Sequence, residues 1–297
     1  MALTINTNIS SLIAQRNLNS ATSALNLSIE RMTTGFTINH ASDNAAGYSI
    51  SNMWETHLGS LDVAADNAAT GADMLTTAEE TYGLLLDHMQ RIRDLTEQAG
   101  NGTYGSASLK AIKSEIVARL DEINRISANA EFNGIKLMNG TTGAIKLQVG
   151  LYDDTNSQIT LADTIFAKAD SLTLFKDTNY GNITGATSSD DIATKLSGYV
   201  SGSCKNDQAS YLAGIDKIIA NYSDRVTNIG AAQNRVTSAI TALDVQVQNL
   251  TSSLSTLRDT DIAQESSNYI QAQILQQASA TLLSTANQLP SIALNLI

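Results

Sequence analysis

The sequence predicts a mainly α protein: a long antiparallel helical coiled-coil or bundle rod, a small β-hairpin region, and N- and C-terminal helices that pair with each other. Two observations lead to this fold class. Apolar residues recur with a seven-residue repeat through residues 226–257, and the chain of 297 residues contains a single proline. Because a proline inside a helix costs about 3 kcal/mol, its scarcity favours long, unbroken helices.

The strongest helical signal lies in the last third of the chain. Its apolar residues fit a coiled-coil heptad: Val226, Ile229, Val236, Ile240, Leu243, Val247, Leu250, Leu254 and Leu257. A helix over residues 208–258 would be roughly 75 Å long at 1.5 Å per residue. A helix of that length needs partners to cover its apolar stripe. We expect them from helices over residues 57–99 and 106–130, whose apolar residues also recur every three or four positions.

The middle of the chain changes period. Ile145, Leu147 and Val149 alternate with polar residues, a turn-rich DDTNS follows at 153–157, and Ile159 and Leu161 resume the alternation. This pattern is typical of a β-hairpin. Residues 166–207 are rich in Gly, Ser, Thr and Asp and hold no sustained period, so we expect a short, variable, exposed surface segment with one helix around 190–200.

Both chain ends lack charge. Residues 1–15 and 266–297 contain no Asp, Glu, Lys or Arg, yet each end carries apolar residues at helical spacing. Two weakly amphipathic helices can pair and cover each other's apolar stripes. We expect a first helix to about residue 33, then a turn-rich connector over 36–47. The candidate interface residues of the two ends are Ile5, Ile9, Leu12, Leu18, Leu25, Ile270, Ile274, Leu282 and Leu289.

This order of elements predicts a chain that runs out along a rod and returns. The expected domains are 1–42 with 259–297 as a terminal helical domain, 43–165 with 208–258 as a helical rod with a hairpin, and 166–207 as the variable segment. Both termini should then lie at the same end.

Composition excludes several classes of function. The net charge is −11, which argues against nucleic acid or a membrane surface as a partner. The sequence has no run of 18 apolar residues and no secretory signal peptide. Cys204 is the only cysteine, so no intrachain disulfide can form.

No catalytic pattern is present either. HExxH, GxSxG and the P-loop are all absent. The pair Asp153–Asp154 lies in a turn, where solvated carboxylates are common. We therefore expect no catalytic, cofactor or metal site, and no enzymatic activity.

Several long blocks, in order, closely resemble the bacterial flagellin family over roughly residues 1–165 and 208–297. They are MALTINTNISSLIAQRNLN, SIERMTTGFTINHASDNAAGYSIS, QRIRDLTEQAGNGT, EINRISANAEFNGIKLMNG, IGAAQNRVTSAI and IQAQILQQASATLLSTANQ. The resemblance implies that the paired chain ends form the innermost layer of a filament and that the rod with its hairpin forms the next layer. The outer domains that many flagellins insert are nearly missing, which implies a short form.

The resemblance also implies a function and partners. The chain would be a structural subunit that polymerises into the extracellular flagellar filament for motility, after export in an unfolded state through the flagellar type III apparatus. Its partners would be further copies of itself, an export chaperone, the filament cap and the hook–filament junction proteins.

An immune receptor is a further implied partner. In flagellins sensed by Toll-like receptor 5, the block that matches Gln90 to Leu95 contributes an arginine and a leucine, which correspond to Arg91 and Leu95, and Glu115 matches a glutamate on the next helix. Asp94 and Thr96–Glu97 depart from the commonest pattern. The alternative role for these side chains is contact with neighbouring subunits.

Two other readings remain open at this point. A hook–filament junction protein shares the terminal helices of flagellins, and formation of long homopolymers would distinguish the two. A flagellin that carries a protease insert would show zinc-dependent proteolysis.

Overall fold

The computed structural model describes residues 8–176, 187–197 and 208–296. The chain forms two compact units, one of Met1–Gly59 with Val247–Ile297 and one of Ser60–Gln246. The limits of both units fall inside long helices. Helices dominate the described residues, so the mainly α prediction is confirmed.

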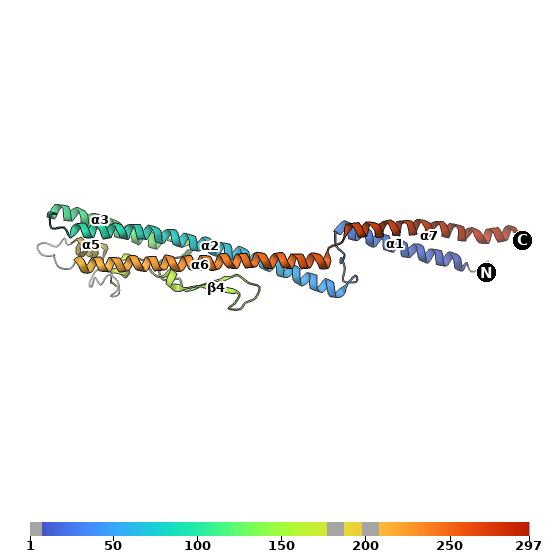
Figure 1. The fold of residues 1–297 in the computed structure, drawn as a ribbon, viewed down its shortest axis with the longest axis horizontal. Helices are drawn as coiled ribbons and strands as arrows, with labels where there is room; N and C mark the ends of the chain where they lie inside the picture. The colour runs from blue at the N-terminus through green and yellow to red at the C-terminus, as the bar shows by residue number, and fades with distance from the viewer. Residues whose placement is uncertain (1–7, 177–186, 198–207, 297) are drawn as a thin grey trace. The chain divides into compact units, whose positions relative to one another are not determined.

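Two helices make up most of the first unit. α1 (Ile9–Thr34) and α7 (Ile262–Leu296) lie side by side (Figure 1). They are antiparallel, because Asn8 at the start of α1 bonds to Ala286 late in α7, whereas Thr22 bonds to Gln276 nearer the start of α7. The predicted pairing of the terminal helices is confirmed, and the start of α1 lies beside the end of α7.

Three long helices shape the second unit. α2 (Ala45–Ala99), α3 (Ser106–Asn129) and α6 (Gln208–Arg258) lie side by side there (Figure 1). Of the predicted heptad, Ile229, Val236 and Leu243 are at most 3% exposed. α6 therefore packs through positions that its seven-residue repeat indicates.

The structure begins α2 earlier than the sequence predicts, at Ala45 rather than near residue 57. The side chain of Asn44 accepts a hydrogen bond from the backbone N–H of Gly47 at 2.9 Å. An Asn at this position satisfies a donor that the first helical turn leaves free. The expected connector therefore shrinks to the residues between Thr34 and Ala45.

Four short strands follow α3. β3 (Ile145–Gln148) and β4 (Gln158–Leu161) pair antiparallel with Leu147 opposite Ile159, which confirms the predicted hairpin. β1 (Glu131–Phe132) and β2 (Ile135–Lys136) form a smaller hairpin that the sequence analysis missed. Its turn places Asn133 and Gly134 at φ values of 48° and 80°, the positive values that a two-residue type I′ turn requires.

The prediction that residues 166–207 form an exposed surface segment is wrong for the part that the structure describes. A 3-10 helix η1 (Asp163–Phe166) leads into α4 (Ser171–Lys176) and α5 (Ser189–Ser197). Their apolar side chains enter the core of the second unit at no more than 3% exposure: Ile165, Phe166, Ala169, Leu174, Phe175, Ile192, Ala193 and Leu196. This part of the segment therefore belongs to the core of the second unit and is not a surface appendage. Cys204 lies outside the described residues.

A buried polar network holds this segment to α2 and α6. The hydroxyl of Tyr82 donates to the carbonyl of Ile165, and the hydroxyl of Tyr222 donates to the carbonyl of Ala169. The guanidinium of Arg225 donates to Tyr82 and to the carbonyl of Ala167. These bonds satisfy the backbone carbonyls of Ile165, Ala167 and Ala169.

Candidate assembly surface

The contact between α1 and α7 is made by small side chains. On α1 the buried positions are Ala14, Ala21 and Ser28, and on α7 they are Glu265, Ala272, Ser279 and Ala286. Successive positions on each helix are seven residues apart, the repeat of a coiled coil. We call this contact the small-residue seam. Small side chains at such positions let two helix backbones approach closely.

Neutral hydrogen bonds accompany the seam. Gln276 donates to the hydroxyl of Thr22 at 3.1 Å, and Ser11 donates to the side chain of Asn287 at 2.7 Å. Asn8 donates to the carbonyl of Ala286 and also accepts from the N–H of Ser11, which caps α1. Uncharged polar residues at the chain ends therefore help to pair the two helices.

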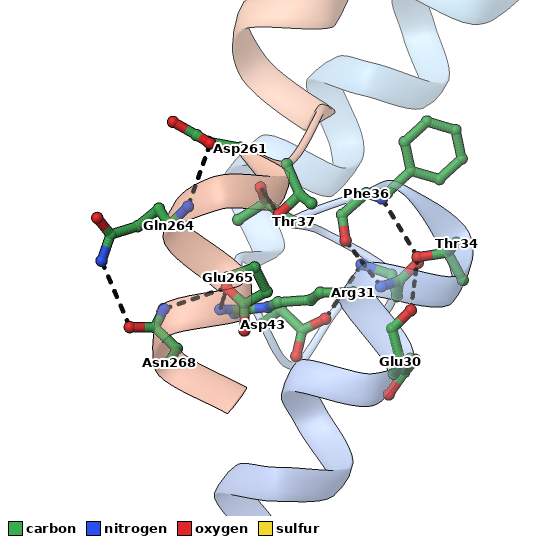
Figure 2. Close-up of polar contacts among 12 residues, drawn as sticks. Glu30, Arg31, Thr34, Phe36, Thr37, Asp43, Asp261, Gln264, Glu265 and Asn268 are labelled. Carbon is green, nitrogen blue, oxygen red and sulfur yellow. Dashed lines mark hydrogen bonds and ion pairs between the residues drawn. The ribbon is translucent and has the colours of Figure 1, made fainter. Parts of the chain in front are cut away.

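A charged pair lies at one end of the seam (Figure 2). The guanidinium of Arg31 lies 4.0 Å from the carboxylate of Glu265, and Asn268 donates a hydrogen bond to the same carboxylate. Glu265 is 6% exposed, so this is a carboxylate that the fold has taken out of water. Gly35 ends α1 with φ of 77°, a left-handed conformation that glycine adopts without strain.

The connector then pairs with the residues that join α6 to α7. The N–H of Thr37 donates to the carbonyl of Arg258, and the N–H of Thr260 donates to the carbonyl of Gly35. The guanidinium of Arg258 lies 4.2 Å from the centre of the Phe36 ring and bonds to Glu55. In the next turn the N–H groups of Asn39 and His40 bond to Asp43, which lowers the pKa of that carboxyl.

Large apolar side chains of the terminal helices face away from the seam. Exposed fractions of 46–64% are found for Ile9, Leu12, Ile13, Ile270, Ile274, Leu275 and Leu282. Leu18 and Leu25 are half-buried. We call the exposed set the outward apolar face. Large apolar side chains left exposed in such number on one helix pair favour a binding surface for another protein or copy.

This arrangement corrects one expectation. From the sequence we expect the apolar stripes of the two chain ends to cover each other, whereas Ile270, Ile274 and Leu282 stay exposed and small residues make the contact. The signal was present as alanines and serines seven residues apart, but the larger residues at three- and four-residue spacing obscured it. Ile5 and the side chain of Leu289 lie outside the described part of the chain.

The residues that match the receptor block occupy α2 and α3 of the second unit. Arg91 donates to Glu115 at 2.9 Å, and this bond together with the charge of Glu115 raises the pKa of Arg91. Gln90 is also exposed. Leu95 is only 2% exposed and packs in the core, so its side chain is not on the surface of the single chain. The structure thus presents three of the four predicted residues together.

The described residues contain no cluster of three or more His, Cys, Asp or Glu side chains that could hold a metal ion. None of the described helices is long and apolar enough to cross a membrane.

Comparison with known proteins finds matches over most of the chain. Residues 5–142 match the bacterial flagellin N-terminal helical region, and residues 212–297 match the bacterial flagellin C-terminal helical region. Over their full lengths, the chain is 33% identical to polar flagellin F of Vibrio parahaemolyticus and 32% identical to flagellin C of Vibrio anguillarum.

A solved structure shares the fold. The structure of a putative flagellar hook-associated protein from Vibrio parahaemolyticus aligns with a TM-score of 0.59 at 14% identity, over 73% of this chain and 100% of that one. The alignment to polar flagellin F spans 378 positions against 297 residues here, as a short form requires. On these matches the chain belongs to the bacterial flagellin family, whose members are structural subunits of the flagellar filament and not enzymes.

Proposed function

We propose that this chain polymerises with copies of itself through the outward apolar face of α1 and α7, which forms the inner layer of the flagellar filament. The proposal rests on one observation: two sets of side chains on α1 and α7 occupy different positions. Small residues pair the helices within one chain, and large apolar residues stay available for neighbours. Each large side chain that a neighbour buries contributes about 1.5–3 kcal/mol.

Energetics link the ordering of the chain ends to assembly. The seam buries mainly methyl and hydroxymethyl groups, so it offers little apolar area to offset the conformational entropy of two ordered helices, about 1–2 kcal/mol per residue. Burial of the outward apolar face by neighbouring subunits supplies the missing area. We therefore expect the terminal helices to gain stability on polymerisation, and hydrogen exchange of residues 9–34 and 262–288 to slow in the polymer.

The other parts of the proposal follow from family membership. The chain would leave the cell unfolded through the flagellar type III apparatus with an export chaperone, and would add to a filament between the junction proteins and the cap. Its location would be the extracellular filament.

The test compares three forms of the purified chain by negative-stain electron microscopy after salt-induced polymerisation. The first is the natural chain and the second is a truncation that lacks residues 266–297. The third carries Ile270→Gln, Ile274→Gln and Leu282→Gln, which change only exposed side chains. Long filaments from the natural chain alone would support the proposal.

A matched control carries Gln271→Ala, Gln277→Ala and Thr281→Ala, which change exposed polar residues of the same helix. It should polymerise like the natural chain. Filaments of normal length from the triple glutamine variant would show that the outward apolar face is not the polymer contact.

Toll-like receptor 5 is a second proposed partner. Gln90, Arg91 and Glu115 form an exposed set whose residue types match the receptor block. Arg91→Ala and Glu115→Ala should each reduce signalling in receptor-expressing cells, whereas Arg125→Ala on the exposed side of α3 should not. Equal signalling by all three variants would show that Arg91 and Glu115 do not contact the receptor.

The alternative function is that of a hook–filament junction protein. The fold likeness to a putative hook-associated protein favours it, since the likeness extends over all of that chain. A junction protein would not form long homopolymers. The same microscopy therefore decides between the two.

A further inference from the structure

The small-residue seam does not by itself specify one register. Ala14, Ala21 and Ser28 repeat every seven residues, and so do Ala272, Ser279 and Ala286. If one helix slides by seven residues, small side chains still meet small side chains over most of the contact. If side-chain size alone set the alignment, a slip of seven residues would cost little free energy, as in any regular repeat.

The charged pair breaks this repeat. Between Ile9 and Ile29 the only charged residue is Arg16, which is exposed, and α7 has no charge after Glu265. Arg31 is therefore the cation available to a carboxylate in the seam. Glu265 is 6% exposed, and its contacts are Arg31 at 4.0 Å and Asn268 at 3.2 Å.

A slip of one heptad would move Glu265 from Arg31 to the neighbourhood of Ala24. The carboxylate would then remain in the helix contact without a cation. A buried charge that loses its partner is strongly destabilising, because the desolvation of the charge is no longer offset. The neutral bonds of Ser11 and Thr22 lie at exposed or half-buried positions, where water can replace the lost partner at little cost.

We propose that Arg31 and Glu265 act together as a register lock, which holds α1 and α7 in one alignment and rejects the slipped pairings that the small-residue seam would otherwise allow. The pair therefore selects the one alignment of α1 against α7 in which Arg31 meets Glu265. The proposal concerns pairing within a single chain, but its test uses the polymer and so rests on the proposed polymerisation, because neighbouring subunits stabilise the terminal helices.

A second feature competes for this role. The backbone bonds between Gly35 and Thr260 and between Thr37 and Arg258 also join the two chain ends. If these bonds alone set the alignment, removal of the charges would leave it unchanged. The experiment separates the two explanations.

The alignment can be read by disulfide trapping in the full-length chain with Cys204→Ser. Ser11→Cys with Asn287→Cys reports the native register, since these two side chains touch at 2.7 Å. Ser11→Cys with Ala280→Cys reports a slip of seven residues. The polymer is oxidised mildly and then dissociated, and peptide mass spectrometry of the monomer band from a non-reducing gel quantifies each intrachain disulfide.

In chains that keep both Arg31 and Glu265, we expect more of the native disulfide than of the slipped one. In Arg31→Met the ratio of native to slipped disulfide should fall at least about tenfold, because the buried carboxylate then lacks a cation in both registers and no longer favours the native one. In Arg31→Met with Glu265→Met the ratio should fall as well, because a neutral seam favours no register. The reversed pair Arg31→Glu with Glu265→Arg should restore the native ratio.

Arg16→Met is the matched control, since it removes the exposed cation of α1 outside the seam, and it should leave the ratio unchanged. An unchanged ratio in both methionine backgrounds would overturn the register lock in favour of the backbone bonds. Loss of both disulfides in Arg31→Met that the reversed pair does not repair would also overturn it.

Discussion

At the scale of single residues, one glycine of α2 permits the hairpin to pack. A Cβ at Gly71 would lie 2.4 Å from Cδ1 of Leu147, whereas a Cβ at Gly83 on the same helix meets nothing within 4 Å. Gly71→Ala should destabilise the fold by about 1–3 kcal/mol through overpacking. Gly83→Ala should stabilise it by about 0.5–1 kcal/mol, because glycine has a high entropy in the unfolded chain.

Urea unfolding monitored by circular dichroism measures both substitutions. Opposite signs are expected for two chemically identical changes on one helix. Equal free energies of unfolding for the two variants would mean that Leu147 moves aside at no cost.

Two buried tyrosines should make the fold sensitive to alkali. Burial raises the pKa of the hydroxyls of Tyr82 and Tyr222 above the usual value of 10.0. The folded state therefore keeps these protons while the unfolded state loses them above about pH 10. The stability that the tyrosines contribute is present in full below that pH and is lost as the pH rises toward the folded pKa, at up to about 1.4 kcal/mol per pH unit for each group.

The check is the urea midpoint at pH 9, 10 and 11. Tyr82→Phe with Tyr222→Phe should lower stability at pH 9, because the carbonyls of Ile165 and Ala169 lose their donors, but should flatten the fall above pH 10. Tyr152→Phe, at an exposed turn residue, should leave the pH profile as it is. A profile that the double variant does not change would show that these hydroxyls ionise equally in both states.

At the scale of helices, the seam should tolerate only small side chains. Ala21→Leu places three extra carbon atoms where the two backbones approach, and should cost about 1–3 kcal/mol or separate the helices. Ala280→Leu adds the same atoms on the exposed side of α7 and should be neutral. Limited proteolysis of α1 and α7 in the polymer distinguishes the two variants. Equal protection from cleavage in both would show that the backbones of α1 and α7 do not approach closely at Ala21.

Much of this level of structure could be predicted from the sequence. The long helices were found because their apolar residues recur over many turns, as in the heptad that buries Ile229 and Val236. A helix around residues 190–200 was expected where α5 lies, but α4 and the burial of both helices could not be predicted, since a helix of six to nine residues has no stability of its own and depends on contacts such as those of Phe175 and Leu196.

The site was predicted in part for a similar reason. The helical spacing of apolar residues at the charge-free chain ends identified Ile9, Leu12, Ile270, Ile274 and Leu282 as interface candidates, but it did not say which side chains pair within a chain. That choice depends on how closely two helices approach, which follows from the sizes of Ala14, Ala21 and Ala272 rather than from hydropathy. Burial of Leu95 likewise depends on packing against elements distant in sequence.

At the scale of the whole molecule, charge should control the rate of assembly. Each copy carries a net charge of −11, so approaching subunits repel one another although the chain ends themselves are neutral. An increase in ionic strength from 0.1 to 1 M shortens the screening length from about 10 Å to about 3 Å. Polymerisation followed by light scattering should accelerate over this range, and a slower reaction at high salt would mean that attractive ion pairs between subunits dominate.

The antiparallel pairing of α1 with α7 also has a practical consequence for labelling. Asn8 touches Ala286, so probes near the two ends of the sequence come together whenever the terminal helices fold, although nearly the whole chain separates them along the backbone. A donor dye at one end and an acceptor at the other would give high energy transfer in the paired state and low transfer in the open one. A single fluorescent molecule could then report, subunit by subunit, when its ends close.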